Sequence, residues 1–389
     1  MPCYVSSKEN RFLAALEQSY ASAADVAAAR ALPALKLAVS HVTERVNRRD
    51  KTGGRTFPGL PSNLRRETSF ELTAYMTSWS PADAEPPHGV LLQAGLGGAP
   101  LSFSGGAVDT ITGTQLRLTA AHGLSVGQAV SCGGEIRFVT AIVDTQTVVL
   151  NAPFTANQAA GWPVDRTVTY APASQLPSAT IFDYWTPAEA VQRILAGAAV
   201  NRVAVEINGD FHQFRFSGAA ADLIDSASFT SGQAGLTAFP AEPTPVELDY
   251  ALVPGHLGQA WLGTNPDQFF TLTSAEVLLD NDLDLRANEF GMSQPRCVAA
   301  GRREVTVDFS LYEKPDAQTT QLYQAARNRS PVSVMFQLGE QPSQLCGVYL
   351  KSVVLEAPEF LDDEVKLEWR FRNCRAQGVT DDEIFIAFG

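Results

Sequence analysis

The sequence predicts a mainly β protein in which one β-rich module occurs twice and a small all-β domain interrupts the first copy. Two segments carry the repeat, 65–76 and 302–313. In each, two arginines and a glutamate come before a strand whose apolar residues alternate, as in a strand with one buried face. These repeated residues are Arg65, Arg66, Glu67, Arg302, Arg303 and Glu304. Two modules in one chain favour a symmetric assembly over an active site.

The spacing of the matches predicts where the copies lie. Arg66 matches Arg303 at an offset of 237, whereas strand 202–207 matches 352–357 at an offset of about 150. An insertion in the first copy accounts for the difference. The sequence therefore predicts a first module at 1–100 and 166–235, an inserted β domain at 101–165, a linker at 236–260 and a second module at 261–389.

The first module is expected to start with a helical arm. Residues 9–32 are rich in alanine and leucine, which predicts one or two short helices ending at Pro33. A strand at 35–46 and a basic, glycine-bearing loop at 51–59 follow. After the first copy of the repeat, the apolar spacing of 89–96 predicts a short helix.

The later elements are expected to be mostly strands. Short alternating segments separated by glycine and polar turns predict the inserted domain. Asn208-Gly209 lies between two apolar runs, which indicates a two-residue hairpin. Residues 218–260 are expected to be loops. The second half is expected to contain a helix at 319–328 and strands at 272–279, 301–312, 332–338, 347–355, 364–371 and 384–388.

Composition and charge limit the function classes. Of 389 residues, 45% are hydrophobic and 18% charged, which is typical of a folded protein, and the start of the chain lacks the apolar core of a signal peptide. The net charge is −13. Residues 1–239 hold 19 acidic and 17 basic side chains, and 240–389 hold 23 and 12. Such a surface disfavours adhesion to nucleic acid, because binding a duplex depends on cationic side chains.

Motifs for catalysis or cofactor binding are missing from the sequence. It has no phosphate-binding loop, no H-E-x-x-H and no nucleophile elbow. The five cysteines and five histidines lack metal-ligand spacing. We therefore expect no catalytic residues, cofactor or metal, and the protein is not expected to be an enzyme.

The chain resembles siphophage major tail tube proteins, in particular those with two tandem tube modules. Segment 275–283 is similar to the family's strand leading to an Asp-Asn turn, and 301–306 to its glycine-basic strand opening. Segment 381–388 is similar to the acidic, β-rich C-terminus of the family. In the first module, 197–203 and 216–219 also match. The helical arm and the insert depart from the pattern.

The resemblance implies that each module is a β-sandwich or half-barrel whose sheet joins its neighbours in a continuous inner β-barrel. Because the usual ring is six-fold, two modules per chain imply homotrimeric, pseudo-hexameric rings stacked around a negatively lined channel. DNA would be a transient, non-specific cargo. The implied partners are other copies of the chain and the terminator, tape measure and distal tail proteins, with no membrane. The implied location is the virion tail, assembled in the host cytoplasm, with the insert outside the tube.

One basic segment is a candidate for contacts between subunits. Against the acidic second half, we expect it to reach an acidic surface of the next ring or subunit. The alternative is a solvated, mobile loop. The candidate residues are Arg45, Arg48, Arg49, Lys51 and Arg55.

Two other functions stay open from the sequence. Another ring-forming tail component, such as a hub, distal tail or terminator protein, would use the same module. A carbohydrate-binding β-sandwich would need an exposed aromatic cluster, and an enzyme a close carboxylate pair; neither is evident in the sequence.

Overall fold

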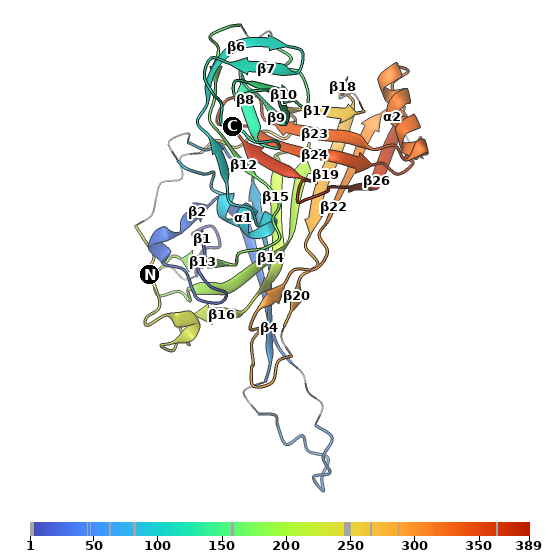
Figure 1. Ribbon diagram of the computed structural model, residues 1–389. Helices are drawn as coiled ribbons and strands as arrows, with labels where there is room; N and C mark the ends of the chain where they lie inside the picture. Colours follow the sequence, from blue (N-terminus) through green and yellow to red (C-terminus); the bar gives the residue numbers. More distant parts are fainter. Residues whose placement is uncertain are drawn as a thin grey trace.

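A computed structural model describes residues 4–44, 46, 48–61, 64–80, 83–156, 159–244, 250–264, 267–286, 288–362 and 365–389. The protein is mainly β, as predicted, with two α-helices among these residues. A large network of strands forms the body, and a smaller six-stranded sheet lies at one end of it (Figure 1). A long arm, which includes residues 48–61, extends from the other end.

A curved sheet of eight antiparallel strands runs through both halves of the chain. Each neighbouring pair is antiparallel, so the strand direction alternates across the whole sheet. In spatial order its strands are β3 (Ala34–Thr43), β4 (Arg66–Tyr75), β15 (Gln213–Ala220), β14 (Arg193–Ile207), β19 (Leu272–Asp280), β22 (Glu304–Tyr312), β26 (Glu368–Ala376) and β25 (Glu359–Leu361). The junction between the halves is the pairing of β14 with β19.

The two halves have the same order of strand pairing. In the first half β3 pairs with β4, β4 with β15, β15 with β14, and β14 with β13 (Ala179–Trp185). In the second half β19 pairs with β22, β22 with β26, β26 with β24 (Cys346–Val354), and β24 with β23 (Val332–Leu338). The helices occupy equivalent places, since α1 (Gly89–Leu96) follows β4 and α2 (Ala317–Asn328) follows β22.

Irregularities in the registers also correspond. The β3–β4 register shifts between Ala34 and Lys36, and the β19–β22 register shifts between Leu272 and Ser274. The β13–β14 register shifts at Ala179, and the β23–β24 register shifts at Val332. β-Bulges of this kind are specific features of a fold, so their agreement supports the correspondence of the halves.

The registers correct the offset of about 150. With the offset of 237, Leu72 of the first half corresponds to Phe309 of the second. Leu72 lies opposite Phe216, and Phe309 lies opposite Phe371. Phe216 therefore corresponds to Phe371, an offset of 155, and strand 202–207 corresponds to 357–362 rather than to 352–357. The β14–β15 connection at Asn208, where φ is 65°, then corresponds to the connection between β25 and β26.

A second layer covers one face of the curved sheet. This outer layer comprises β5 (Leu101–Phe103), β12 (Thr167–Tyr170), β27 (Phe385–Phe388), β24, β23, β17 (Gly258–Gly263) and β18 (Asp267–Gln268). Its strand β27 pairs with β12 of the first half and with β24 of the second. Apolar side chains of both layers and of the two helices form one continuous core. Burial of this core is the main driving force for folding.

The six-stranded sheet contains the residues predicted to form the inserted domain. Its strands, in spatial order, are β11 (Pro163–Val164), β6 (Gly106–Thr112), β7 (Gln115–Leu118), β10 (Thr147–Leu150), β9 (Glu135–Ile142) and β8 (Ala129–Cys132). It has an apolar core of its own around Leu116, Val130 and Val148. The division of the chain into domains stays a prediction.

The predicted helical arm is wrong. The N-terminal segment instead forms β1 (Asn10–Leu16), a 3-10 turn η1 (Val26–Ala28) and β2 (Arg30–Leu32). Strand β1 pairs along its whole length with β13, and its buried Phe12 and Ala14 join the core. Alanine and leucine favour helices intrinsically, but pairing and burial in a sheet outweigh that preference.

Part of the predicted loop region also contains strands. Strand β15 continues to Ala220, and β16 (Asp222–Asp225) pairs with the first half of β14. A short 3-10 turn, η2 (Gln233–Gly235), follows. The predicted linker overlaps β17, whose first residue is Gly258. In the second half, β20 (Asp284–Leu285) and β21 (Val298–Ala299) form a two-stranded ribbon within the loop between β19 and β22.

Candidate channel and assembly surfaces

The curved sheet has one face away from the core, which we call the open face. Alternation along its strands places apolar residues such as Phe70 and Leu72 in the core and sends Glu71 and Thr73 to the open face. The same alternation holds in β22, where Val305 and Val307 are buried. A broad, polar sheet surface results.

Carboxylates outnumber cations on the open face. Arg215 lies between two of them, with Nη2 2.7 Å from Glu206 and 2.8 Å from Glu276. Arg202 pairs with Asp280 at 2.6 Å, and Arg375 with Glu304 at 2.5 Å. The carboxylates that the alternation assigns to this face are Glu67, Glu71, Glu206, Glu276, Asp280, Glu304, Asp308, Glu359 and Glu368, and the cations are Lys36, Arg202, Arg215, Arg370, Arg372 and Arg375.

The curved sheet ends in two edge strands, β3 and β25. Among the described residues, each of them pairs with a neighbour on one side only. Both edges expose apolar side chains: Val42 on β3 and Phe360 on β25 are each 52% exposed. An unpaired strand edge with exposed apolar residues is a template for pairing with another chain.

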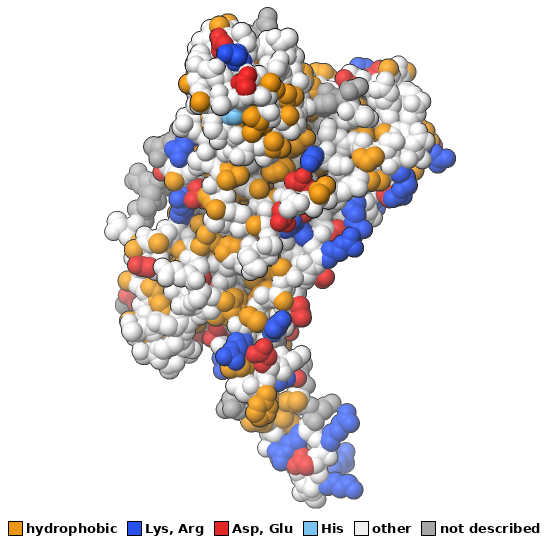
Figure 2. Space-filling model, viewed as in Figure 1, with side chains coloured by type: hydrophobic (Ala, Val, Ile, Leu, Met, Phe, Trp, Pro, Cys, Tyr) orange, Lys and Arg blue, Asp and Glu red, His pale blue; other side chains and the backbone are white. Residues whose placement is uncertain are grey.

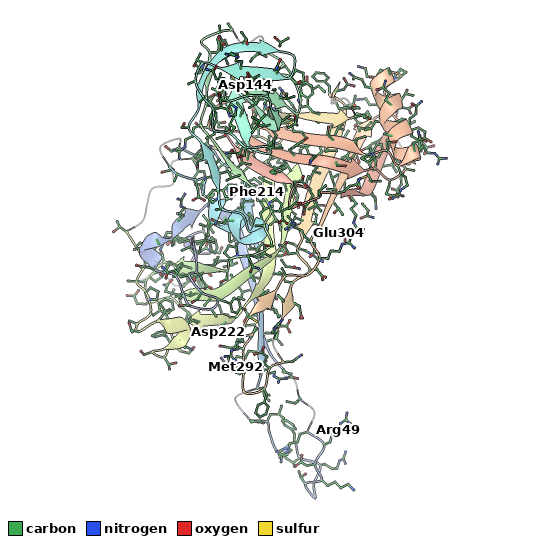
Figure 3. The ribbon with its side chains drawn as sticks, in the orientation of Figure 1. Arg49, Asp144, Phe214, Asp222, Met292 and Glu304 are labelled. Carbon is green, nitrogen blue, oxygen red and sulfur yellow. The ribbon has the colours of Figure 1, made fainter. Side chains whose placement is uncertain are left out.

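The arm carries the basic segment identified in the sequence. Arg48 makes two bonds to Asp50, of 2.6 and 2.8 Å, and one to the carbonyl oxygen of Gly59. Arg49, Lys51 and Arg55 are exposed. Arg45 lies outside the described residues. Figure 2 shows that basic side chains gather on the arm, and Figure 3 shows Arg49 on the arm, distant from Glu304 on the sheet.

The opposite end of the curved sheet exposes carboxylates. The registers place the β14–β15 turn, the end of β22 and the end of β25 there, because Tyr75 lies opposite Gln213 and Glu368 lies opposite Tyr312. Exposed acidic residues at this end are Asp210, Glu313 and Asp362, and two lysines, Lys314 and Lys366, accompany them. The arm and this end are therefore of partly complementary charge.

The repeated residues do not form one site. The first three lie at the start of β4 and the other three at the start of β22, which are different strands. Arg303 donates hydrogen bonds to Asp381, to Glu383 and, at 3.1 Å, to the carbonyl oxygen of Ala173. Glu304 pairs with Arg375, and Arg65 donates a hydrogen bond to Asn288. Arg66 lies near Asp222, and both Arg302 and Glu67 are exposed. The structural role expected for the repeated residues stays a prediction.

A buried arginine, missed from the sequence, fixes the six-stranded sheet against the outer layer. Arg137 of β9 is 0% exposed and donates to Glu135, Gln259 and Gln337, with bonds of 2.7, 2.9 and 3.0 Å. Its guanidinium also stacks over the ring of Trp261 at 4.8 Å. Burial lowers its pKa to about 10, so it stays charged at neutral pH. Nothing in its sequence context distinguishes it from an exposed strand arginine.

The described residues contain no group of three or more potential metal ligands, and none of their helices is long and apolar enough to cross a membrane. Of the cysteines that the structure describes, Cys132, Cys346 and Cys374 are buried and Cys297 is half-buried. Burial raises the pKa of the Cys132 thiol to about 11 and that of Cys374 to about 12, which makes both poor nucleophiles.

Comparison with known proteins shows which family the chain belongs to. A sequence model of the phage tail tube protein family matches residues 64–370, which is well over half of the chain and includes both copies of the repeat. A search of curated proteins found no match. Tail tube proteins are structural components of the virion that assemble into a tube. The chain belongs to the phage tail tube protein family and is a structural component of a phage tail.

Proposed function

We propose that the chain is the major tail tube subunit of a siphophage, with two tandem modules, and that three copies form each pseudo-hexameric ring. The observation that carries this proposal is the shared pairing order of the two halves, with bulges at corresponding positions. A ring of three such chains presents six similar units to its neighbours. Stacked rings give an open tube by a head-to-tail interface that repeats along the axis.

In this proposal the open face lines the channel. Its excess of carboxylates repels a DNA backbone, so that DNA passes as transient cargo without adhering. Exposed ion pairs, such as Arg202–Asp280, keep the local charge mixed. The chain performs no catalysis and needs no cofactor in this role.

The position of the six-stranded sheet supports a place outside the tube. Strand β23 directs Val334 and Phe336 toward the core, and Met335 and Gln337 toward the six-stranded sheet. The outer layer therefore separates that sheet from the curved sheet and from the proposed channel. There it would not obstruct ring closure.

The arm supports contact between successive rings. It continues β3 and β4 beyond one end of the curved sheet, and exposed carboxylates lie at the other end (Figure 1). In a stacked tube these two ends meet, which brings Arg48, Arg49, Lys51 and Arg55 toward the next ring. The terminator, tape measure and distal tail proteins are the other proposed partners, with assembly in the host cytoplasm.

Electron microscopy of the purified protein tests the proposal. We expect hollow tubes whose rings contain three subunits. Single rings that never stack would favour a hub, distal tail or terminator protein. A monodisperse monomer, together with tubes lacking this chain in purified virions, would overturn the proposal and favour a carbohydrate-binding or other module.

A further inference from the structure

We infer that β3 of one subunit pairs with residues 357–362 of the next subunit, in the register that β19 and β14 use within a single chain. The inference rests on the proposed function and assigns the contact that closes the ring. The partner is a second copy of this chain, and two observations support the pairing: the internal junction and a cavity.

The internal junction supplies the register. Strand β19 runs antiparallel to the second half of β14, from Asp280 opposite Arg202 to Ala275 opposite Ile207. The core-side residues at its centre, Val277 and Val205, lie opposite each other and are each 1% exposed. This is the joint between the first half of the chain and the second.

The two edges of the curved sheet correspond to the two strands of that joint. By the registers, β3 corresponds to β19, with Leu37 in the place of Ala275. Residues 357–362 correspond to 202–207, with Phe360 in the place of Val205. Phe360 is 52% exposed where Val205 is buried. Its burial needs a strand in the position that β19 occupies inside the chain.

Strand direction permits the closure. The curved sheet has eight strands that alternate in direction, so its first and last strands are antiparallel. Rotating a second copy about a ring axis preserves its direction and sets its β3 antiparallel to β25. The inferred register places Ser40 opposite Glu359 and Ala38 opposite Leu361. Such a junction is heterologous and repeats around a closed ring.

The loop after β19 shows how the joint is completed. Asn281 is 2% exposed, and its Nδ2 donates to the carbonyl oxygens of Gly95, at the C-terminal end of α1, and of Val200, at 2.8 and 3.1 Å. The backbone N–H of Leu283 donates to Oδ1 of Asn201 at 2.9 Å. The chain leaving β19 therefore fills the space between α1 and β14.

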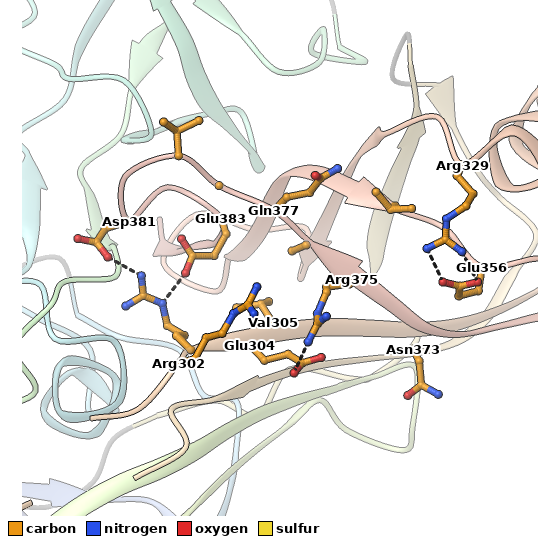
Figure 4. Close-up of a pocket in the computed structure, with 15 residues that line it drawn as sticks. Arg302, Glu304, Val305, Arg329, Glu356, Asn373, Arg375, Gln377, Asp381 and Glu383 are labelled. Atoms are coloured by element: carbon orange, nitrogen blue, oxygen red, sulfur yellow. Dashed lines mark hydrogen bonds and ion pairs between the residues drawn. The ribbon is translucent and has the colours of Figure 1, made fainter. Parts of the chain in front are cut away.

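The corresponding space in the second half is a cavity of about 750 Å³. Its lining includes Arg329, which caps the C-terminal end of α2, and Val354 and Glu356, which correspond to Ala199 and Asn201 (Figure 4). Arg329 and Glu356 pair across it at 3.0 Å. In the inferred ring, the residues that follow β3 of the next subunit, among them Glu44 and Val46, occupy this cavity. Val46 is 44% exposed in the single chain.

Disulfide trapping tests the register. The variant S40C/E359C joins two residues that the inferred register sets directly opposite, within the Cα separation of a disulfide. The matched control S40C/L361C shifts one partner by two residues on the same face, beyond that range. A second pair, A38C/L361C, tests the same register independently. All are made with C3S and C297S, which removes the cysteines that are half-buried or outside the described residues.

After mild oxidation of assembled protein, we expect S40C/E359C and A38C/L361C to give at least about ten-fold more inter-subunit product than S40C/L361C. On a non-reducing gel the ladder should end at three chains. Tubes that form normally but link preferentially through S40C/L361C, or through none of the pairs, would overturn the inferred pairing and leave the proposed function intact. Failure of the wild-type protein to form any ring or tube would overturn the proposed function itself. If either S40C/E359C or A38C/L361C prevents folding, the remaining pair tests the inferred register.

Discussion

The guanidinium of Arg137 and the side-chain oxygen of Gln337 lie 3.0 Å apart, across the boundary between the six-stranded sheet and the outer layer. Both side chains are buried, and Gln337 also accepts from the backbone N–H of Ile136 at 3.0 Å. This polar contact lies among apolar side chains such as Phe138 and Tyr349, whose rings are 5.2 Å apart. The attachment of the six-stranded sheet therefore combines apolar burial with a buried, hydrogen-bonded ion pair between Arg137 and Glu135.

Loss of Arg137 should destabilise this attachment strongly. In R137A, Glu135 remains as a buried carboxylate without its cation, which costs about 3–5 kcal/mol of unfolding free energy. The control R117A, in the same sheet, removes an exposed ion pair with Asp109 and should cost less than about 1 kcal/mol. Chemical denaturation followed by tryptophan fluorescence measures both. Equal effects of the two substitutions would contradict this prediction.

The two arginines of the second repeat should differ in importance. In R303A, the hydrogen bonds to Asp381, Glu383 and the Ala173 carbonyl are lost, and the C-terminal segment loses an anchor to the first half of the chain. We expect a loss of about 2 kcal/mol, because these bonds are charge-assisted and partly buried. The neighbouring R302A removes an exposed side chain and should stay within about 0.5 kcal/mol of the parent protein. Thermal unfolding compares the pair.

Stability should fall in mild acid because of His88. Burial against Phe214 lowers the pKa of His88 from 6.5 to about 4. The folded state therefore favours neutral His88, so its contribution is complete above pH 6.5 and is lost as the pH falls toward 4. The loss is about 3 kcal/mol at most.

Denaturation at a series of pH values measures this dependence. H88Q should flatten the slope between pH 6.5 and 4, leaving the smaller part contributed by His212, whose pKa burial also lowers. An unchanged slope in H88Q would show that other groups determine the acid sensitivity.

Charge reversal in the arm should weaken ring stacking. R48E/R49E replaces two cations that are expected to face carboxylates of the next ring, so tubes should become shorter and less abundant. The defect should be larger at about 0.05 M salt than at about 0.5 M, because salt screens exposed charges. The control K8E reverses an exposed cation outside the arm. Electron micrographs measure the length and yield of the tubes. If R48E/R49E leaves both unchanged, the arm is a solvated loop that does not contribute to stacking.

Local signals explain what the sequence predicted well. Asn208-Gly209 identified the β14–β15 hairpin because the turn needs a positive φ, which Asn208 adopts. Helix α2 was identified from its apolar spacing, although it starts at Ala317, where Asp316 accepts a hydrogen bond from the backbone N–H of Thr319. The mainly β fold class followed from alternation in many short segments.

Tertiary contacts explain what the sequence did not show. Strand β1 has a helix-like composition and is a strand because β13 pairs with it. The offset of about 150 was obtained by matching alternating apolar residues, which can be aligned in many registers. The informative signal was the match of the aromatic residues Phe214 and Phe216 with Trp369 and Phe371. The importance of Asn281 depends on carbonyl groups of α1 and β14 that lie far away in the sequence.

The junction of β14 with β19 differs in one respect from the junction inferred between subunits. The covalent linker holds its two strands at a high effective concentration, so that they pair without a diffusional encounter. Charged residues are tolerated there, among them Arg202, Asp280, Glu206 and Glu276. The corresponding positions on the two open edges carry Ala357, Val42, Leu361 and Ala38, none of which is charged. In the proposed assembly, fusion of two modules relieves one junction of the need for apolar adhesion, whereas the junction inferred between subunits recruits its partner from solution.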